Sequence, residues 1–125
     1  MGIKEHRSRK NPFVLTQIAM LRDPDIQELS ANAFRLWIYL RAAFNPQKEE
    51  CFNIASGKKQ VYLPFSTIQR IKGLKSPHTV IKAIRELTEG QFIELTERGR
   101  GNGSRNAYTF VGKYAEYPGE WKYNK

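Results

Sequence analysis

The order of structural signals within residues 61–111 constrains the fold of this chain more than any other feature. The apolar run at 61–63 predicts a short strand, and Pro64 suits the first turn of a helix that would extend to residue 72. Gly73 suits the left-handed backbone conformation that ends a helix, and Leu74 is then placed to fill the corner. A second helix and two further strands follow this turn.

The second helix has clear start and stop signals. Ser76 is placed to cap it, Pro77 is a favourable first residue, and Gly90 closes it. The 13 residues 77–89 would span roughly 20 Å, which suits the DNA major groove. Helical spacing predicts a buried stripe of Val80, Ala83, Ile84 and Leu87. The same spacing predicts that the other face is exposed, with His78, Thr79, Lys82, Arg85, Glu86 and Glu89.

The two strand-like runs, 92–97 and 105–111, predict a hairpin with a basic tip. The tip and its edge carry Arg98, Arg100 and Arg105, together with three glycines and Asn102. Glycine allows a close approach of the backbone, and arginine binds phosphate with a forked pair of donors. The glycine spacing does not match the dinucleotide-binding fingerprint, and a strand rather than a helix follows it.

An earlier helix is predicted over residues 30–43, capped by Ser30 or Asn32. Its predicted buried face holds Ala33, Leu36, Trp37, Leu40 and Phe44, widened by Phe34 and Ile38. With this helix as scaffold, the chain has the element order of a winged helix-turn-helix. We therefore predict an α+β, mainly α fold: a three-helix core with the helix-turn-helix at 64–89 and a β-hairpin wing at 92–111.

The remaining segments are interpreted as additions to one domain spanning residues 13–125. Residues 1–12 are predicted to form a flexible basic arm. Residues 13–21 are predicted to form an extended segment or short strand, followed by a turn at 22–25. Residues 45–60 predict an unusually long linker. The C-terminal segment carries an aromatic tail of Tyr114, Tyr117, Trp121 and Tyr123. This tail is expected either to fold back over the first helix or to form a dimer contact.

Charge favours a polyanionic partner. The formal net charge is +9, and residues 56–113 carry eleven of the basic side chains against four acidic ones. The N-terminal 12 residues add a net +3, whereas residues 13–55 are slightly acidic. A cationic surface concentrated in this way attracts nucleic acid through electrostatic steering and counterion release. We therefore expect double-stranded DNA as the partner.

No catalytic, metal or cofactor site is predicted. The candidate groups His6, His78 and Cys51 belong to different predicted elements, without the spacing of a triad or a metal centre. Asp23 and Asp25 share a turn but have no further ligands nearby in the sequence. The chain has no apolar run long enough to cross a bilayer, and one cysteine cannot form an internal disulfide. A cytoplasmic DNA-binding protein that is not an enzyme is expected.

The predicted DNA-binding residues come from the second helix and the wing. Positions near the start of that helix are where a recognition helix meets bases, and here they are Ser76, His78, Thr79 and Lys82. Cations that would neutralise phosphates or contact base edges are Lys75, Lys82, Arg85, Arg98, Arg100 and Arg105. Asn102 lies at the tip of the wing and completes the predicted site.

Residues 29–40, 63–68, 76–87 and 90–93 together resemble the winged-helix domain near the N-terminus of phage and plasmid replication initiators and replisome organisers. The spacing of Ser76, Thr79, Val80, Ala83, Ile84, Leu87, Gly90 and Ile93 is common to many winged-helix regulators. The resemblance covers about residues 13–123. It implies sequence-specific duplex binding during replication initiation of a phage, plasmid or mobile element, with a second copy or replication proteins as partners.

This chain departs from those initiators because it lacks the following region that recruits a helicase or its loader. It is then either a piece of a longer protein or a stand-alone DNA binder such as a transcriptional regulator. Another alternative is a protein-docking module without strong DNA binding. In that case the aromatic tail and the helix side bearing Trp37 would form the interface.

Overall fold

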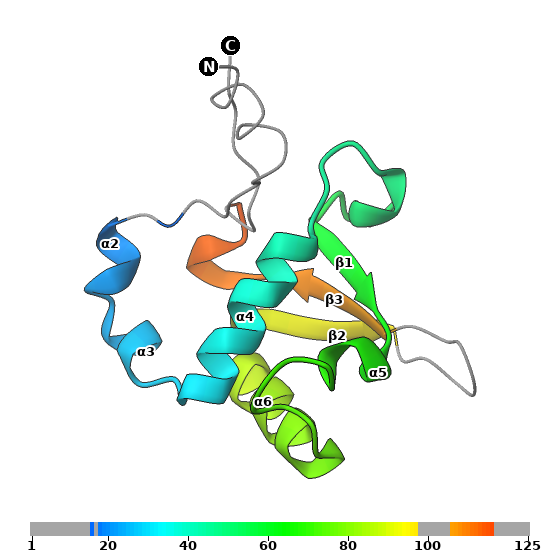
Figure 1. The fold of residues 1–125 in the computed structure, drawn as a ribbon. Coiled ribbons are helices and arrows are strands. Elements are labelled where there is room, and N and C mark those ends of the chain that lie inside the picture. Colours follow the sequence, from blue (N-terminus) through cyan, green and yellow to red (C-terminus); the bar gives the residue numbers. More distant parts are fainter. Residues whose placement is uncertain (1–15, 17, 98–105, 117–125) are drawn as a thin grey trace, which may run out of the picture.

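The computed structural model describes residue 16, residues 18–97 and residues 106–116 (Figure 1). It has an α+β fold. The helices are α2 (Ile18–Leu21), α3 (Pro24–Gln27), α4 (Ala31–Ala43), α5 (Phe65–Ile68) and α6 (Pro77–Glu89), with short 3-10 turns η1 (Glu49–Cys51) and η2 (Gly112–Tyr114). The strands are β1 (Gln60–Leu63), β2 (Ile93–Glu97) and β3 (Asn106–Phe110). None of the described helices is long and apolar enough to cross a membrane.

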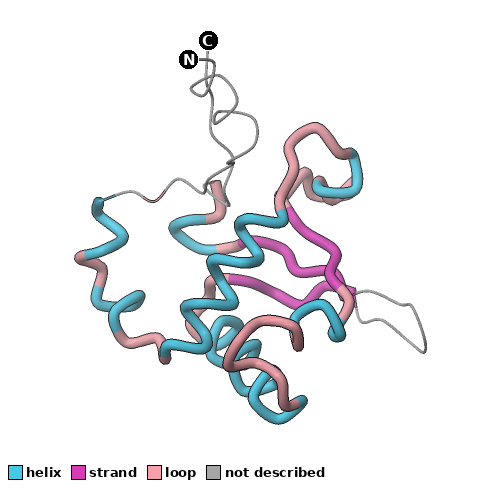
Figure 2. Tube along the Cα trace, in the orientation of Figure 1, coloured by secondary structure: helices cyan, strands magenta, loops and turns pink. Residues whose placement is uncertain are grey.

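The three strands form one antiparallel sheet in the order β1-β3-β2 (Figure 2). Ile93 pairs with Phe110 at one end of the β2–β3 pair, and the register shifts between Leu95 and Glu97. The predicted hairpin is therefore confirmed as a strand pair. Its tip, residues 98–105, lies outside the described residues, as does the predicted arm at 1–12. The predicted strand at 61–63 is also confirmed, and it pairs with β3 at the edge opposite β2.

Helix α4 is the scaffold that the sequence predicted. The Ser30 hydroxyl accepts a hydrogen bond from the Ala33 N–H at 3.1 Å, which caps its first turn. The helix crosses one face of the sheet in Figure 1 and packs against α6. The predicted stripe is buried, and Trp37 lies edge-on to Phe92 with ring centroids 5.2 Å apart. Trp37 therefore belongs to the core and does not form a contact surface.

A cation is buried in the same core. The Arg41 side chain on α4 is 1% exposed, and its guanidinium carbon lies 4.7 Å from the centre of the Trp37 ring. Burial disfavours the charged form and lowers the pKa of Arg41 to about 10. The aromatic face partly offsets this desolvation because its negative quadrupole attracts the guanidinium.

The N-terminal segment differs from its prediction. Ile18–Leu21 forms a short helix rather than an extended segment or strand, and its only buried side chain is Met20. A helical turn satisfies its backbone groups locally, whereas a strand needs a partner edge. The expected turn at 22–25 leads directly into α3, because Asp23 caps that helix and accepts the Asp25 N–H at 2.9 Å.

Residues 45–60 are a folded segment rather than an open linker. Cys51 is buried, and its sulfur accepts the Asn45 N–H at 3.4 Å. Phe52 and Lys59 form an isolated antiparallel bridge around a turn. The Phe52 ring also meets Phe44 at the end of α4, with ring centroids 5.6 Å apart. These contacts join residues six to eight positions apart in an irregular segment, where no helical or strand period indicates them.

The first helix of the predicted pair is shorter than expected. Helix α5 ends at Ile68, and Pro64 occupies its cap position with an extended backbone rather than its first turn. Turns fill the remainder as far as Leu74, which is buried as predicted. Gly73 has the predicted left-handed conformation, with φ of 91°. Helix α6 has the predicted bounds, with Ser76 as its cap and Pro77 as its first residue.

The expected return of the tail over the first helix is confirmed for Tyr114. Its ring is half-buried, with its centroid 6.0 Å from that of Trp37 on α4. The other three aromatic residues of the predicted tail, Tyr117, Trp121 and Tyr123, lie outside the described residues.

Candidate nucleic-acid interface

The outward face of α6 is the part of the described structure that gathers most of the predicted DNA-binding residues. His78, Lys82 and Arg85 are exposed and follow one another at spacings of four and three residues. Such spacing places side chains on one face of a helix. Of the predicted stripe, Val80, Ala83 and Leu87 are buried on the opposite face, whereas Ile84 is only half-buried at the edge of the core. The helix therefore presents its cations to solvent while its apolar stripe holds it in the core.

The first residues of α6 use their side chains locally. The Ser76 hydroxyl accepts the Thr79 N–H at 3.3 Å, and the Thr79 hydroxyl donates to the same oxygen at 3.4 Å. Thr79 is half-buried, so the prediction that it is fully exposed is wrong. The physical reason is its position on the side of the helix between the buried stripe and solvent. Ser76 remains exposed, and its capping bond fixes the start of the helix.

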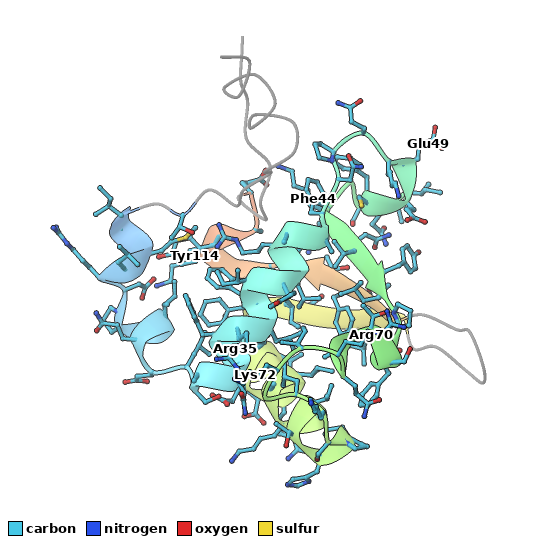
Figure 3. The ribbon with its side chains drawn as sticks, in the orientation of Figure 1. Arg35, Phe44, Glu49, Arg70, Lys72 and Tyr114 are labelled. Atoms are coloured by element: carbon cyan, nitrogen blue, oxygen red, sulfur yellow. The ribbon has the colours of Figure 1, made fainter. Side chains whose placement is uncertain are left out.

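Two long side chains hold the turn between α5 and α6 in place. The Gln69 amide donates to the Lys75 carbonyl at 2.8 Å, and Arg35 on α4 donates from Nη1 to the Lys72 carbonyl at 2.7 Å. Figure 3 shows Arg35 beside Lys72. A Cβ atom at Gly73 would lie 2.7 Å from Oδ1 of Asn32, so the turn passes close to α4. The turn is thereby fixed against the scaffold helix.

The other end of α6 is fixed by Glu86. Its carboxylate accepts the Ser30 backbone N–H at 3.0 Å and the Ser30 hydroxyl at 2.5 Å. Glu86 is therefore half-buried at the start of α4, and the prediction that it is exposed is wrong. In a capping box, this carboxylate would belong to residue 33 of α4, which here is Ala33. Glu86 supplies the carboxylate from α6 instead. Helices α4 and α6 are thus joined by hydrogen bonds as well as by packing.

Additional cations adjoin the predicted set. Arg70 and Lys72 are exposed in the segment that leads to Lys75, although neither is among the predicted site residues. Their position within the predicted helix-turn-helix was the sequence feature that could have assigned them to the site. Across residues 18–97 and 106–116, no ion pair of Lys72, Lys75, Lys82 or Arg85 is found. These charges are available to an external anion.

The structure brings six of the ten predicted residues to α6 and the turn before it. They are Lys75, Ser76, His78, Thr79, Lys82 and Arg85. The other four, Arg98, Arg100, Asn102 and Arg105, lie outside the described residues. Strands β2 and β3 bracket them in the sequence, and Glu97 lies opposite Ala107 at that end of the strand pair.

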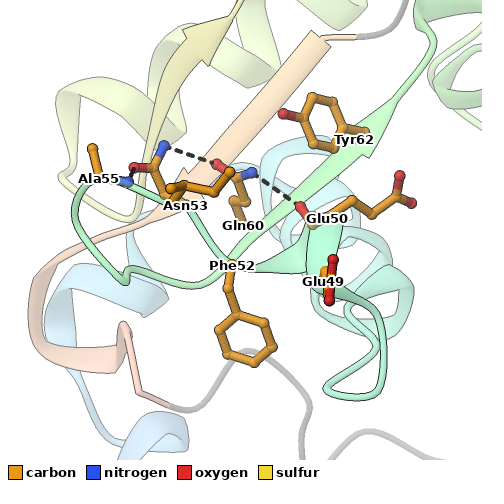
Figure 4. A pocket seen from close by; sticks show the side chains of 8 residues that line it. Glu49, Glu50, Phe52, Asn53, Ala55, Gln60 and Tyr62 are labelled. Carbon is orange, nitrogen blue, oxygen red and sulfur yellow. Dashed lines mark hydrogen bonds between the residues drawn. The ribbon is translucent and has the colours of Figure 1, made fainter.

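A hollow with a volume of about 770 Å³ lies elsewhere, between η1 and β1 (Figure 4). Two of its polar side chains, Gln60 and Asn53, already bond within the fold. The Gln60 amide donates to the Glu50 carbonyl at 3.0 Å, and Asn53 donates to Gln60 Oε1 at 3.4 Å. No group of three or more potential metal-ligating side chains occurs among the described residues. Asp23 and Asp25, the acidic pair considered in the sequence, instead bind Lys113.

A smaller apolar hollow of about 380 Å³ lies between α4 and α5, beside Tyr39 and Ile71, with Arg70 at its edge. Trp37, on the α4 side of the alternative protein contact, does not line this hollow. Comparisons with models of known protein families, with curated protein sequences and with solved structures found no match to this chain.

Proposed function

We propose that this chain binds double-stranded DNA sequence-specifically through the outward face of α6. The supporting observation is a capped helix of 13 residues whose exposed cations have no ion-pair partner in the described part of the chain. A helix of this length fits the major groove, and free cations at its rim suit the phosphates on either side. Hydrogen bonds from Arg35 to the turn before α6, and from Ser30 to Glu86 on α6, support this role, because a reading helix must be held rigidly.

In this proposal the chain is a winged helix-turn-helix. Helices α4, α5 and α6 form the three-helix core, and the β2–β3 pair is the base of the wing. Lys75, Lys82 and Arg85 bind phosphates, while Ser76, His78 and Thr79 lie near the bases. The wing tip contributes Arg98, Arg100, Asn102 and Arg105 to the phosphate backbone.

The proposed setting is replication initiation of a phage, plasmid or mobile element, and it rests on the resemblance in sequence alone. Transcriptional regulation is the alternative setting for the same DNA-binding surface. A gene for a helicase loader beside the gene for this chain would favour replication.

The proposal predicts DNA binding that depends steeply on salt. Measured by fluorescence anisotropy on a labelled duplex, log K should fall with log salt by about 0.9 for each phosphate neutralised. Replacing Lys82 and Arg85 together by Ala removes two such contacts. We therefore expect weaker binding and a slope shallower by about 1.8.

The matched control replaces Lys48 and Lys58, which are exposed on the 45–60 segment. It removes the same charge from a surface away from α6 and should change the slope far less. A wild-type affinity that stays flat with salt would contradict the proposal. Equal losses in the two double variants would remove α6 from the site.

A further inference from the structure

The outward face of α6 carries one large apolar side chain. Ile81 is 48% exposed, one helical turn from His78 on one side and from Arg85 on the other. The other exposed large apolar side chains in the described structure lie on α2, α4 and the turn after η1, namely Ile18, Leu21, Tyr39 and Ile54. Ile81 is therefore an apolar group within an otherwise polar and cationic face.

We infer that Ile81 contacts the C5-methyl group of thymine in the major groove, and this inference rests on the proposed function. The major-groove edge of DNA offers one apolar group, the thymine methyl, among its hydrogen-bond donors and acceptors. An isoleucine cannot donate or accept hydrogen bonds, so the thymine methyl is the base group that it can bind favourably.

The position of Ile81 on the helix suits this contact. Residues three and four apart share a helix face, so Ile81 is a neighbour of both His78 and Arg85. It lies in the N-terminal half of α6, where recognition helices meet base edges. Its branched Cβ strongly restricts the side-chain rotamer in a helix. The methyl-binding surface is thus held in place before DNA arrives.

The burial of apolar surface gives the expected size of the effect. Removing one methyl or methylene from a buried apolar contact costs about 0.8 kcal/mol, which corresponds to about a fourfold change in affinity. Deoxyuridine lacks the C5-methyl and keeps all hydrogen-bonding groups of thymidine. Exchange of a single thymidine for deoxyuridine therefore tests the methyl contact alone.

The experiment uses the full chain and a duplex enriched by it from a randomised pool. Copies of this duplex carry deoxyuridine at one thymidine position at a time, and affinity is measured by anisotropy. We expect a loss of about fourfold at one or two adjacent positions and no change at the others. The Ile81→Ala variant should bind the thymidine and deoxyuridine copies equally, whereas Ile81→Val should retain part of the difference.

Ile54→Ala is the matched control, because Ile54 is fully exposed in the turn after η1. It should discriminate between thymidine and deoxyuridine as the wild type does. Salt-dependent binding without any response to deoxyuridine would overturn the thymine contact and leave the proposed function intact. Discrimination that persists in Ile81→Ala would show that another residue contacts the methyl. Absence of duplex binding would overturn both proposals.

Discussion

Two glycines share a left-handed backbone but differ in their surroundings. Gly57 has φ of 74° with no atom near its Cβ position, whereas Gly112 has φ of 80°. A Cβ on Gly112 would lie 2.2 Å from the Gln91 carbonyl oxygen. Replacing Gly57 by Ala should cost about 1–2 kcal/mol through backbone strain alone. Gly112→Ala should cost roughly 1–3 kcal/mol more, because the backbone at Gln91 must move.

Urea denaturation of the two variants tests this prediction, since the loss in each is read from the transition midpoint. Equal losses would show that the contact with Gln91 is easily relaxed.

The end of α6 shows a backbone feature that local sequence signals do not reveal. Gly90 ends α6 as predicted, but the left-handed residue is Gln91, with φ of 64°. Its N–H and that of Phe92 bond to Thr88 and Leu87, which imposes this conformation despite the side chain.

At the scale of elements, Glu86 links the start of α4 to α6. Its carboxylate accepts two hydrogen bonds from Ser30, so Glu86→Ala should destabilise the fold by about 1 kcal/mol. Thermal and urea unfolding measure the loss. Glu89→Ala is the control, because Glu89 is exposed on the same helix and should change stability by less than about 0.5 kcal/mol. Similar losses in both variants would assign the effect to helix charge rather than to the cap.

Elements with strong local signals were predicted well. The spacing in α4 and the Ser76-Pro77 start of α6 depend on neighbours within one helix, and both helices were placed correctly. The predictions for α5 and for the 45–60 segment were wrong, since α5 is shorter and the segment is packed around contacts such as the Phe52–Lys59 bridge, which follow no helical or strand period. Glu86 was missed because its partner Ser30 lies 56 residues away in the sequence. Ile81 was identifiable from its angle on the helix, but only the structure shows that no neighbouring element covers it.

At the scale of the whole molecule, a polar cluster joins segments 91 residues apart. The Tyr114 hydroxyl donates to Asp23 Oδ2 at 2.5 Å, and the Lys113 ammonium lies 2.7 Å from the same oxygen. Lys113 also lies 3.0 Å from Asp25 Oδ2. The hydrogen bond to Asp23 raises the pKa of the Lys113 ammonium and that of the Tyr114 hydroxyl. The cluster thereby fastens α3 to the end of the sheet, where Tyr114 covers Trp37.

This cluster predicts an acid-sensitive contribution to stability. Hydrogen bonds from Lys113 and Tyr114 lower the pKa of Asp23 from 3.8 to about 2. A lowered carboxyl pKa stabilises the folded state above the unfolded pKa, and this contribution is lost as pH falls through the folded pKa. The stability difference between wild type and Asp23→Asn should therefore be largest above pH 4 and shrink toward pH 2, as measured by urea unfolding. Asparagine keeps a carbonyl acceptor for the Asp25 N–H, so the helix cap is retained. A difference that stays constant over this interval would show that the charge of Asp23 does not hold the two segments together.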